Sequence, residues 1–300
     1  MIEAQNISKQ FDGFWALENV SCRIERGSIY GMVGSNGAGK STLLRILSGI
    51  YRPNSGTVLL DGAPVYENPE AKAKSAFVPD ALYFPAGATV ARMMAMYRNF
   101  HASFDRARCE ALCKELNLDL QKSIQTFSKG MKRQCATVLA LCTDPEYILF
   151  DETFDGLDPV VRNYVKSLIC KDVLDRGASA VITSHSLREL EDTCDQLTLL
   201  LRGGIVAQSE VQSLKTEHFK VQIAFPDSYD RTRFAGLPGI ELLHFTKQGS
   251  VANLIVKGDR QAVAQALQEL CPSVLDILPL SLEEVFTYEM ETMGYAFNLS

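Results

Sequence analysis

Residues 34–42 read GSNGAGKST, a stretch in which Gly34, Gly39, Lys40 and Ser41 match the pattern G-x-x-x-x-G-K-[ST]. The apolar run SIYGMV precedes this stretch and predicts a short buried strand, whereas LLRILSGI follows it with helical spacing. A strand, a glycine-rich loop and a helix in this order are typical of a loop that binds phosphate groups. The stretch therefore predicts a nucleotide site at the end of a buried strand.

The spacing of this motif has a mechanical reason. Glycines allow backbone N–H groups to curl around phosphate oxygens without Cβ clashes, and a helix that begins near Lys40 points its positive end at the anion. Lys40 would neutralise charge on the β- and γ-phosphates, and Ser41 would be a ligand of Mg²⁺. We therefore expect the nucleotide to be held by the consecutive residues Gly34, Ser35, Asn36, Gly37, Ala38, Gly39, Lys40, Ser41 and Thr42.

Two adjacent carboxylates end a second apolar strand pattern, YILFDE at 147–152. Taken alone, such a pair is usually a solvated strand end, but a phosphate loop in the same chain favours a catalytic reading. Asp151 is then the carboxylate on the metal side of the site. Glu152 would be the general base that orients and activates water, because adjacent side chains at a strand end point in different directions.

Two further elements have both a structural and a functional reading. FSKGM at 127–131 precedes a helical pattern, so Ser128 is either a simple N-cap with a turn glycine after it or part of a second anion site at a helix start. His185 comes after the apolar strand pattern AVIT, where a hydrogen-bonded structural histidine is the usual reading, and a functional reading depends on a family resemblance.

The chain alternates strand and helix patterns up to about residue 212, which predicts a parallel α/β sheet with crossover helices. Methionine, alanine and leucine at helical spacing replace β-branched runs over about 85–142, so we expect an inserted helical lobe there. Residues 215–300 change pattern again and predict a small α+β domain, for which dimerisation, contact with a partner protein and ligand sensing are all open roles.

Composition narrows the class of protein. Hydrophobic residues make up 46% of the chain and charged residues 22%, which is typical of a globular protein. The net charge of -6 argues against nucleic acid as a partner. We see no apolar run of about 20 residues and no signal-peptide pattern, so we expect a cytoplasmic location without direct membrane insertion. The eight cysteines form no CxxC pair, and we expect reduced thiols buried in the core.

The order and spacing of these motifs resemble the ATP-binding subunit of ABC transporters. The resemblance rests on GSNGAGKS, FSKGM, YILFDE, FDGLDP and SH, and it runs over about residues 2–208. It implies a P-loop NTPase core of the ABC ATPase type with an inserted helical subdomain. It also implies ATP and Mg²⁺ as cofactors, and two such subunits that face each other head to tail around two ATP molecules.

The same resemblance assigns roles to individual residues. Ser128 and Gly130 would act on the ATP held by the partner subunit, and Asp158 would communicate between the two sites. His185 would contact the γ-phosphate, and Phe11 lies where the family places an aromatic ring that stacks on adenine, although a plain core phenylalanine is an equal alternative.

The chain also departs from the family pattern. Asp80 stands where the family has a glutamine, and we expect that its carboxylate still touches Mg²⁺ or water while adding negative charge near the triphosphate. Four other departures, none of which removes a catalytic group, are Phe127, Lys129, Met131 and Thr153.

The sequence as a whole predicts an ATPase subunit, paired with a second copy, that drives transport through a separate integral-membrane permease and is held by it on the inner face of the cell membrane. FSKGM, FDGLDP and the closing SLEEVF resemble the stand-alone subunits of bacterial exporters for drugs, peptides or lantibiotics, so we expect export. The alternatives are a soluble ABC-type mechanochemical ATPase and a non-hydrolysing, nucleotide-controlled binding module.

Overall fold

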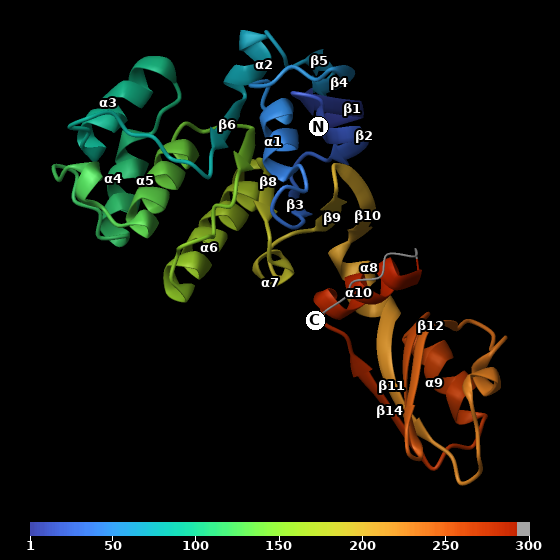
Figure 1. The fold of residues 1–300 in the computed structure, drawn as a ribbon. Helices are drawn as coiled ribbons and strands as arrows, with labels where there is room; N and C mark the ends of the chain where they lie inside the picture. The colour runs from blue at the N-terminus through green and yellow to red at the C-terminus, as the bar shows by residue number, and fades with distance from the viewer. Residues whose placement is uncertain (293–300) are drawn as a thin grey trace. The chain divides into compact units, whose positions relative to one another are not determined.

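The computed structural model describes residues 1–292, which form two compact units, Met1–Gln208 and a second unit that begins at Ser209 (Figure 1). Within this described range, no helix is long and apolar enough to cross a membrane.

A six-stranded sheet with the order β10-β9-β3-β8-β7-β6 forms the centre of the first unit. Its strands are β3 (Ile29–Val33), β6 (Ser75–Val78), β7 (Tyr147–Phe150), β8 (Ser179–Ser184), β9 (Gln196–Leu201) and β10 (Gly204–Glu210). β3 runs parallel to β8 and β9, and β7 runs parallel to β6 and β8. The carboxyl ends of these strands therefore meet at one edge of the sheet, which is where ligands bind in open α/β sheets.

A second, antiparallel sheet has the order β2-β1-β4-β5. Its strands are β1 (Ile2–Phe11), β2 (Phe14–Ile24), β4 (Ser55–Leu60) and β5 (Ala63–Pro64). Register shifts interrupt the pairing of β1 with β2 at three places, the first between Ala4 and Ile7. These bulges break the alternation of inward and outward side chains along the strand.

Helix α1 (Lys40–Leu47) lies against both β1 and β2 and contributes to the main core of the first unit. Leu43, Leu44, Ile46 and Leu47 of this helix are buried, together with residues of both sheets such as Leu17. Burial of one such leucine side chain contributes roughly 1.5–3 kcal/mol. Packing against the core, rather than the intrinsic stability of an eight-residue helix, therefore holds α1 in place.

The helical region consists of α3 (Val90–Phe100), α4 (Arg106–Glu115), the 3₁₀ turn η1 (Ile124–Thr126) and α5 (Lys129–Leu141), which lie together on one side of β6 in Figure 1. Each long helix has a side-chain N-cap, supplied by Thr89, Asp105 and Ser128 respectively. The remaining helices of this unit are α2 (Pro69–Ala73), α6 (Pro159–Arg176) and α7 (Leu187–Leu190).

The second unit contains a four-stranded antiparallel sheet of order β12-β13-β11-β14. Its elements are α8 (Val211–Glu217), β11 (His218–Ala224), η2 (Arg231–Phe234), β12 (Glu241–Gln248), β13 (Val251–Lys257), α9 (Arg260–Gln268), β14 (Val274–Pro279) and α10 (Leu282–Thr292). This order is the ferredoxin-like β-α-β-β-α-β arrangement, with its first helix reduced to the single turn η2.

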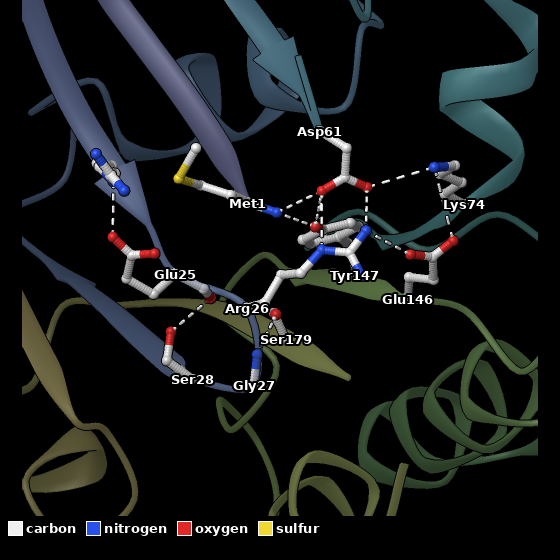
Figure 2. A network of polar contacts seen from close by, with 11 residues as sticks. Met1, Glu25, Arg26, Gly27, Ser28, Asp61, Lys74, Glu146, Tyr147 and Ser179 are labelled. Carbon is white, nitrogen blue, oxygen red and sulfur yellow. Dashed lines mark hydrogen bonds and ion pairs between the residues drawn. The ribbon is translucent and has the colours of Figure 1, made fainter. Parts of the chain in front are cut away.

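A polar network around Asp61 joins the two sheets of the first unit where β1 and β7 begin (Figure 2). The Asp61 carboxylate accepts from the Met1 ammonium at 2.6 Å, from Nε and Nη2 of Arg26 at 3.0 and 2.6 Å, and from the Tyr147 hydroxyl at 2.6 Å. The hydrogen bond from Arg26 holds the pKa of Asp61 below its ordinary value although burial opposes the shift. The network ties β1 and β4 to the start of β7.

All eight cysteines are free thiols. Six of them are buried, Cys170 is half-buried and Cys271 is exposed, so the prediction of core thiols is wrong for Cys271. It lies in the turn that follows α9, at a position with a φ of 55°. Burial raises the pKa of Cys22 and of Cys135 to about 12. Such thiols are inert at neutral pH.

Candidate nucleotide site

The glycine-rich loop joins β3 to α1, and two of its glycines are required by their surroundings. A Cβ atom on Gly34 would lie 2.4 Å from the main-chain oxygen of Leu200. Gly39 has a φ of 104°, and a Cβ atom there would lie 2.6 Å from the main-chain oxygen of Ala16. The loop is therefore pressed against neighbouring backbone, and a side chain at either position would displace it.

Lys40, the first residue of α1, is 5% exposed and extends back along the loop. Its Nζ donates to the main-chain oxygens of Gly34 at 2.6 Å and Ser35 at 3.3 Å. The same ammonium lies 3.2 Å from Oε1 of Glu152. The loop lysine and the carboxylate at the end of β7 thus belong to one site.

Asp151 is fully buried at the end of β7. Its Oδ1 accepts hydrogen bonds from the hydroxyls of Ser41 at 2.8 Å and Thr183 at 2.9 Å. Its Oδ2 lies 3.9 Å from an Arg45 nitrogen and makes no hydrogen bond within residues 1–292. A buried carboxylate oxygen without a hydrogen bond, next to a serine hydroxyl, fits a hard divalent cation such as Mg²⁺, which prefers oxygen ligands.

Glu152 has a φ of 50°, which is uncommon for a residue other than glycine. Its N–H donates to the Thr183 hydroxyl at 3.0 Å, which fixes the turn. Because the chain turns here, the carboxylates of Asp151 and Glu152 point in different directions. Oε1 of Glu152 faces the Lys40 ammonium, and Oε2 lies 2.9 Å from Nδ1 of His185. This arrangement can hold a water molecule for attack on a phosphate.

The FSKGM segment forms a second cluster at the start of α5. Ser128 caps this helix by accepting from the N–H of Met131 at 3.1 Å. A Cβ atom on Gly130 would lie 2.9 Å from the main-chain oxygen of Gly156, so this close approach requires glycine. Lys129 donates to Asp155 at 2.6 Å, and this hydrogen bond lowers the pKa of the Asp155 carboxyl.

Asp158 caps α6 by accepting from the N–H groups of Val160 and Val161. Its carboxylate therefore has a local structural role in the single chain. Phe11 is 39% exposed, and its ring meets that of Tyr51 edge to face at 5.7 Å. Phe11 is thus exposed at the surface of the antiparallel sheet and is not a core residue.

Asp80 follows β6 and accepts a hydrogen bond from Arg133 at 2.8 Å. The sequence did not point to Arg133 or Thr183, although both form hydrogen bonds with the main chain of Asp151 or Glu152 at the carboxyl end of β7. For Thr183 the signal was present, because a polar residue near the end of an apolar strand pattern often serves the site at that edge. Arg133 stands two residues after Met131 and gives no comparable signal.

The loop, the buried carboxylate and the paired lysine and glutamate define a P-loop nucleotide hydrolase. Residues 17–155 match the family model described as ABC transporter. The chain is 32% identical to the ABC transporter ATP-binding protein YtrB of Bacillus subtilis over 95% of its own length and 97% of that protein. The chain therefore belongs to the ATP-binding proteins of ABC transporters, and it is an ATPase of that family.

Two further comparisons agree with this assignment. The lipopolysaccharide export system ATP-binding protein LptB of Haemophilus influenzae is 28% identical over 69% of this chain and 89% of its own. A solved structure of the ATP-binding subunit of an ABC transporter superposes with a TM-score of 0.66 and 25% identity, over 71% of this chain and 91% of that one. The predicted P-loop core of the ABC ATPase type is thereby confirmed.

Proposed function

We propose that this ATPase works as one of a pair of identical subunits that drive export through a separate membrane permease, with ATP and Mg²⁺ bound at the Lys40 site. The observation that carries the hydrolytic part of this proposal is the position of Glu152, held between Lys40 and His185 next to the Ser41–Asp151 pair. These are the groups that phosphoryl transfer to water requires.

Each residue of the site has a distinct task in this proposal. The N–H groups of residues 34–42 and the Lys40 ammonium hold the β- and γ-phosphates. Ser41 and Asp151 would hold Mg²⁺, which when bound neutralises phosphate charge. Glu152 accepts the proton of the attacking water, and His185 orients Glu152 and the γ-phosphate.

Dimerisation completes the site. Ser128 and Gly130 lie at the N-terminus of α5, a thirteen-residue helix whose first amides suit an anion. Two such subunits placed head to tail would each supply this helix start to the ATP of the other, with Asp158 at the boundary. Phe11, exposed beside the antiparallel sheet, would stack on the adenine ring.

Other observations support the proposed contact with the permease and the proposed direction of transport. Tyr83 is 84% exposed and Phe100 is 78% exposed, and aromatic residues are enriched in protein interfaces relative to the rest of the surface. Both lie in or next to the helical region, which we propose as the part that contacts the permease. This contact would hold the subunit on the inner face of the cell membrane. The relative named for lipopolysaccharide export supports export as the direction.

The second unit would contribute to dimerisation or to the permease contact. Its sheet ends in the edge strands β12 and β14, and β14 exposes Val274 and Leu278, which are 43% and 41% exposed. Exposed edge strands are frequent sites of pairing with another chain.

Purification from membranes tests this proposal. The tagged chain, solubilised in mild detergent, should retain an integral membrane protein and release phosphate from ATP. A Lys40→Ala chain purified in the same way should retain the membrane protein without releasing phosphate. Wild-type chain that hydrolyses ATP but retains no integral membrane protein would contradict the transport part of the proposal.

A further inference from the structure

Arg133 is a charged residue inside the first unit. Its side chain is 1% exposed, in the first half of α5. Nη1 donates to the main-chain oxygen of Asp151 at 3.2 Å, and Nη2 donates to Oδ1 of Asp80 at 2.8 Å. Nε is buried and has no hydrogen-bond partner within residues 1–292. The guanidinium thus joins α5 to two other segments of the nucleotide-binding unit.

A guanidinium stays protonated in proteins, and a buried one requires a negative partner. The ion pair recorded for Arg133 in the described part of the chain is with Asp80, whose side chain is 51% exposed. The pair is therefore asymmetric, because loss of Asp80 leaves a buried charge unpaired, whereas Asp80 alone would be solvated.

The three joined segments all belong to the hydrolytic site. Arg133 lies five residues after Ser128, which begins α5. The carbonyl that it holds belongs to Asp151, and the next residue is Glu152 with its positive φ. Asp80 follows β6, the edge strand that pairs with β7. A shift of α5 would therefore move the main chain at the catalytic carboxylates.

We infer that Arg133 is a positioning residue for ATP hydrolysis and that Asp80 is its counterion, not a ligand of Mg²⁺. This inference explains from within the chain why an aspartate stands at position 80, because a neutral glutamine would leave the Arg133 charge uncompensated. It replaces the metal role that the sequence suggested for Asp80, and it rests on the proposed site at Lys40 and Glu152.

A double-mutant cycle tests the pairing with Asp80→Gln, Arg133→Gln and the double variant. Each single variant should lower kcat by about tenfold or more, and the double variant should lose much less than the product of the two. The affinity for a fluorescent ATP analogue should stay within about threefold, because Lys40 and the loop are unchanged. Additive losses in the double variant would overturn the inference.

Metal binding separates the two roles of Asp80. Mn²⁺, titrated by electron paramagnetic resonance with ATP and the protein, should bind the Asp80→Ala variant, which has no side-chain oxygen at this position, within about twofold of wild type. A tenfold weaker Mn²⁺ affinity for Asp80→Ala, with unchanged affinity for Arg133→Gln, would make Asp80 a metal ligand and overturn the inference.

Two further variants control for folding and for charge. Arg133→Lys keeps the positive charge at this buried position and replaces Arg133→Gln in the cycle if that variant does not fold; its kcat should lie between those of wild type and Asp80→Gln. Glu110→Gln removes one charge from the exposed pair with Arg106 on α4 and should leave kcat unchanged. If Glu152→Gln hydrolysed ATP at the wild-type rate, the proposed site would fail, independently of the coupling between positions 80 and 133.

Discussion

Oε2 of Glu152 lies 2.9 Å from Nδ1 of His185, across the adjacent ends of the parallel strands β7 and β8. The two side chains are thirty-three positions apart in the sequence and meet because parallel strands end at one edge of the sheet. The other oxygen of Glu152, Oε1, lies 3.2 Å from the Lys40 ammonium, so each carboxylate oxygen has its own partner.

Replacement of His185 by asparagine should lower kcat by about a hundredfold, because the carboxylate of Glu152 then loses the partner that orients it. The KM for ATP should change little, since Lys40 and the loop bind the phosphates. Steady-state phosphate release at several ATP concentrations measures both constants. A large rise in KM with unchanged kcat would show that His185 serves binding instead.

Replacement of Thr183 by valine should lower kcat about tenfold and the free energy of unfolding by about 1–2 kcal/mol. The hydroxyl donates to Asp151 and accepts from the Glu152 N–H, so its loss frees both groups. Thr137→Val is the matched control, because the buried Thr137 hydroxyl has no partner within residues 1–292. Equal effects of the two substitutions on stability would refute a specific role of Thr183.

The Asp61 network should make stability depend on pH in the acid range. The pKa of folded Asp61 lies below its ordinary value, so its stabilisation is complete above about pH 4 and is lost as the pH falls toward the folded pKa. Asp61→Asn should lower the free energy of unfolding at pH 7 by about 2 kcal/mol, and the difference from wild type should shrink below about pH 4.

Denaturant unfolding at several pH values measures this difference. Glu25→Gln is the control, because Glu25 pairs with Arg23 at an exposed position close to Arg26. A difference between Asp61→Asn and wild type that stays constant from pH 7 to pH 3 would contradict the account.

Mixed dimers test the proposed sharing of sites. In a mixture of Ser128→Arg chains and Lys40→Ala chains, each heterodimer keeps one site with Lys40 from one subunit and Ser128 from the other. ATP should therefore allow these differently tagged chains to pair, while neither variant pairs with itself. Failure of the mixture to pair, in conditions where tagged wild-type chains do pair, would place both residues in the same site of one chain.

The residues that the sequence assigns to the phosphate loop and to the ends of two strands lie together in the fold, because their positions follow local rules. A glycine-rich loop lies between a strand and a helix, and Asp151 and His185 follow apolar strands, so parallel topology alone brings them to one edge. Two helices are shorter than their sequence patterns predict. The pattern LRELEDTC predicts a helix over 187–194, but α7 ends at Leu190, and the short helix that the pattern places between KVQIAF and IELLHF is the single turn η2.

Features that depend on distant contacts were not predicted. The antiparallel sheet contains β1 and β2, whose bulges hide the alternation that marks a strand. Arg133 carries no sequence signal of its burial, yet it is buried and paired with Asp80, and Lys129, a departure from the family pattern, pairs with Asp155. These partners lie in the segments that follow β6 and β7, far from α5 in the sequence.

Glu152→Gln gives the most direct test of hydrolysis at this site. The substitution keeps the shape of the side chain and removes the charge that accepts the proton of water. The variant should bind ATP with Mg²⁺, release phosphate at least about a hundredfold more slowly than wild type, and elute as a dimer that retains ATP in gel filtration. Phosphate release at the wild-type rate, with no dimer that retains ATP, would contradict the role assigned to Glu152.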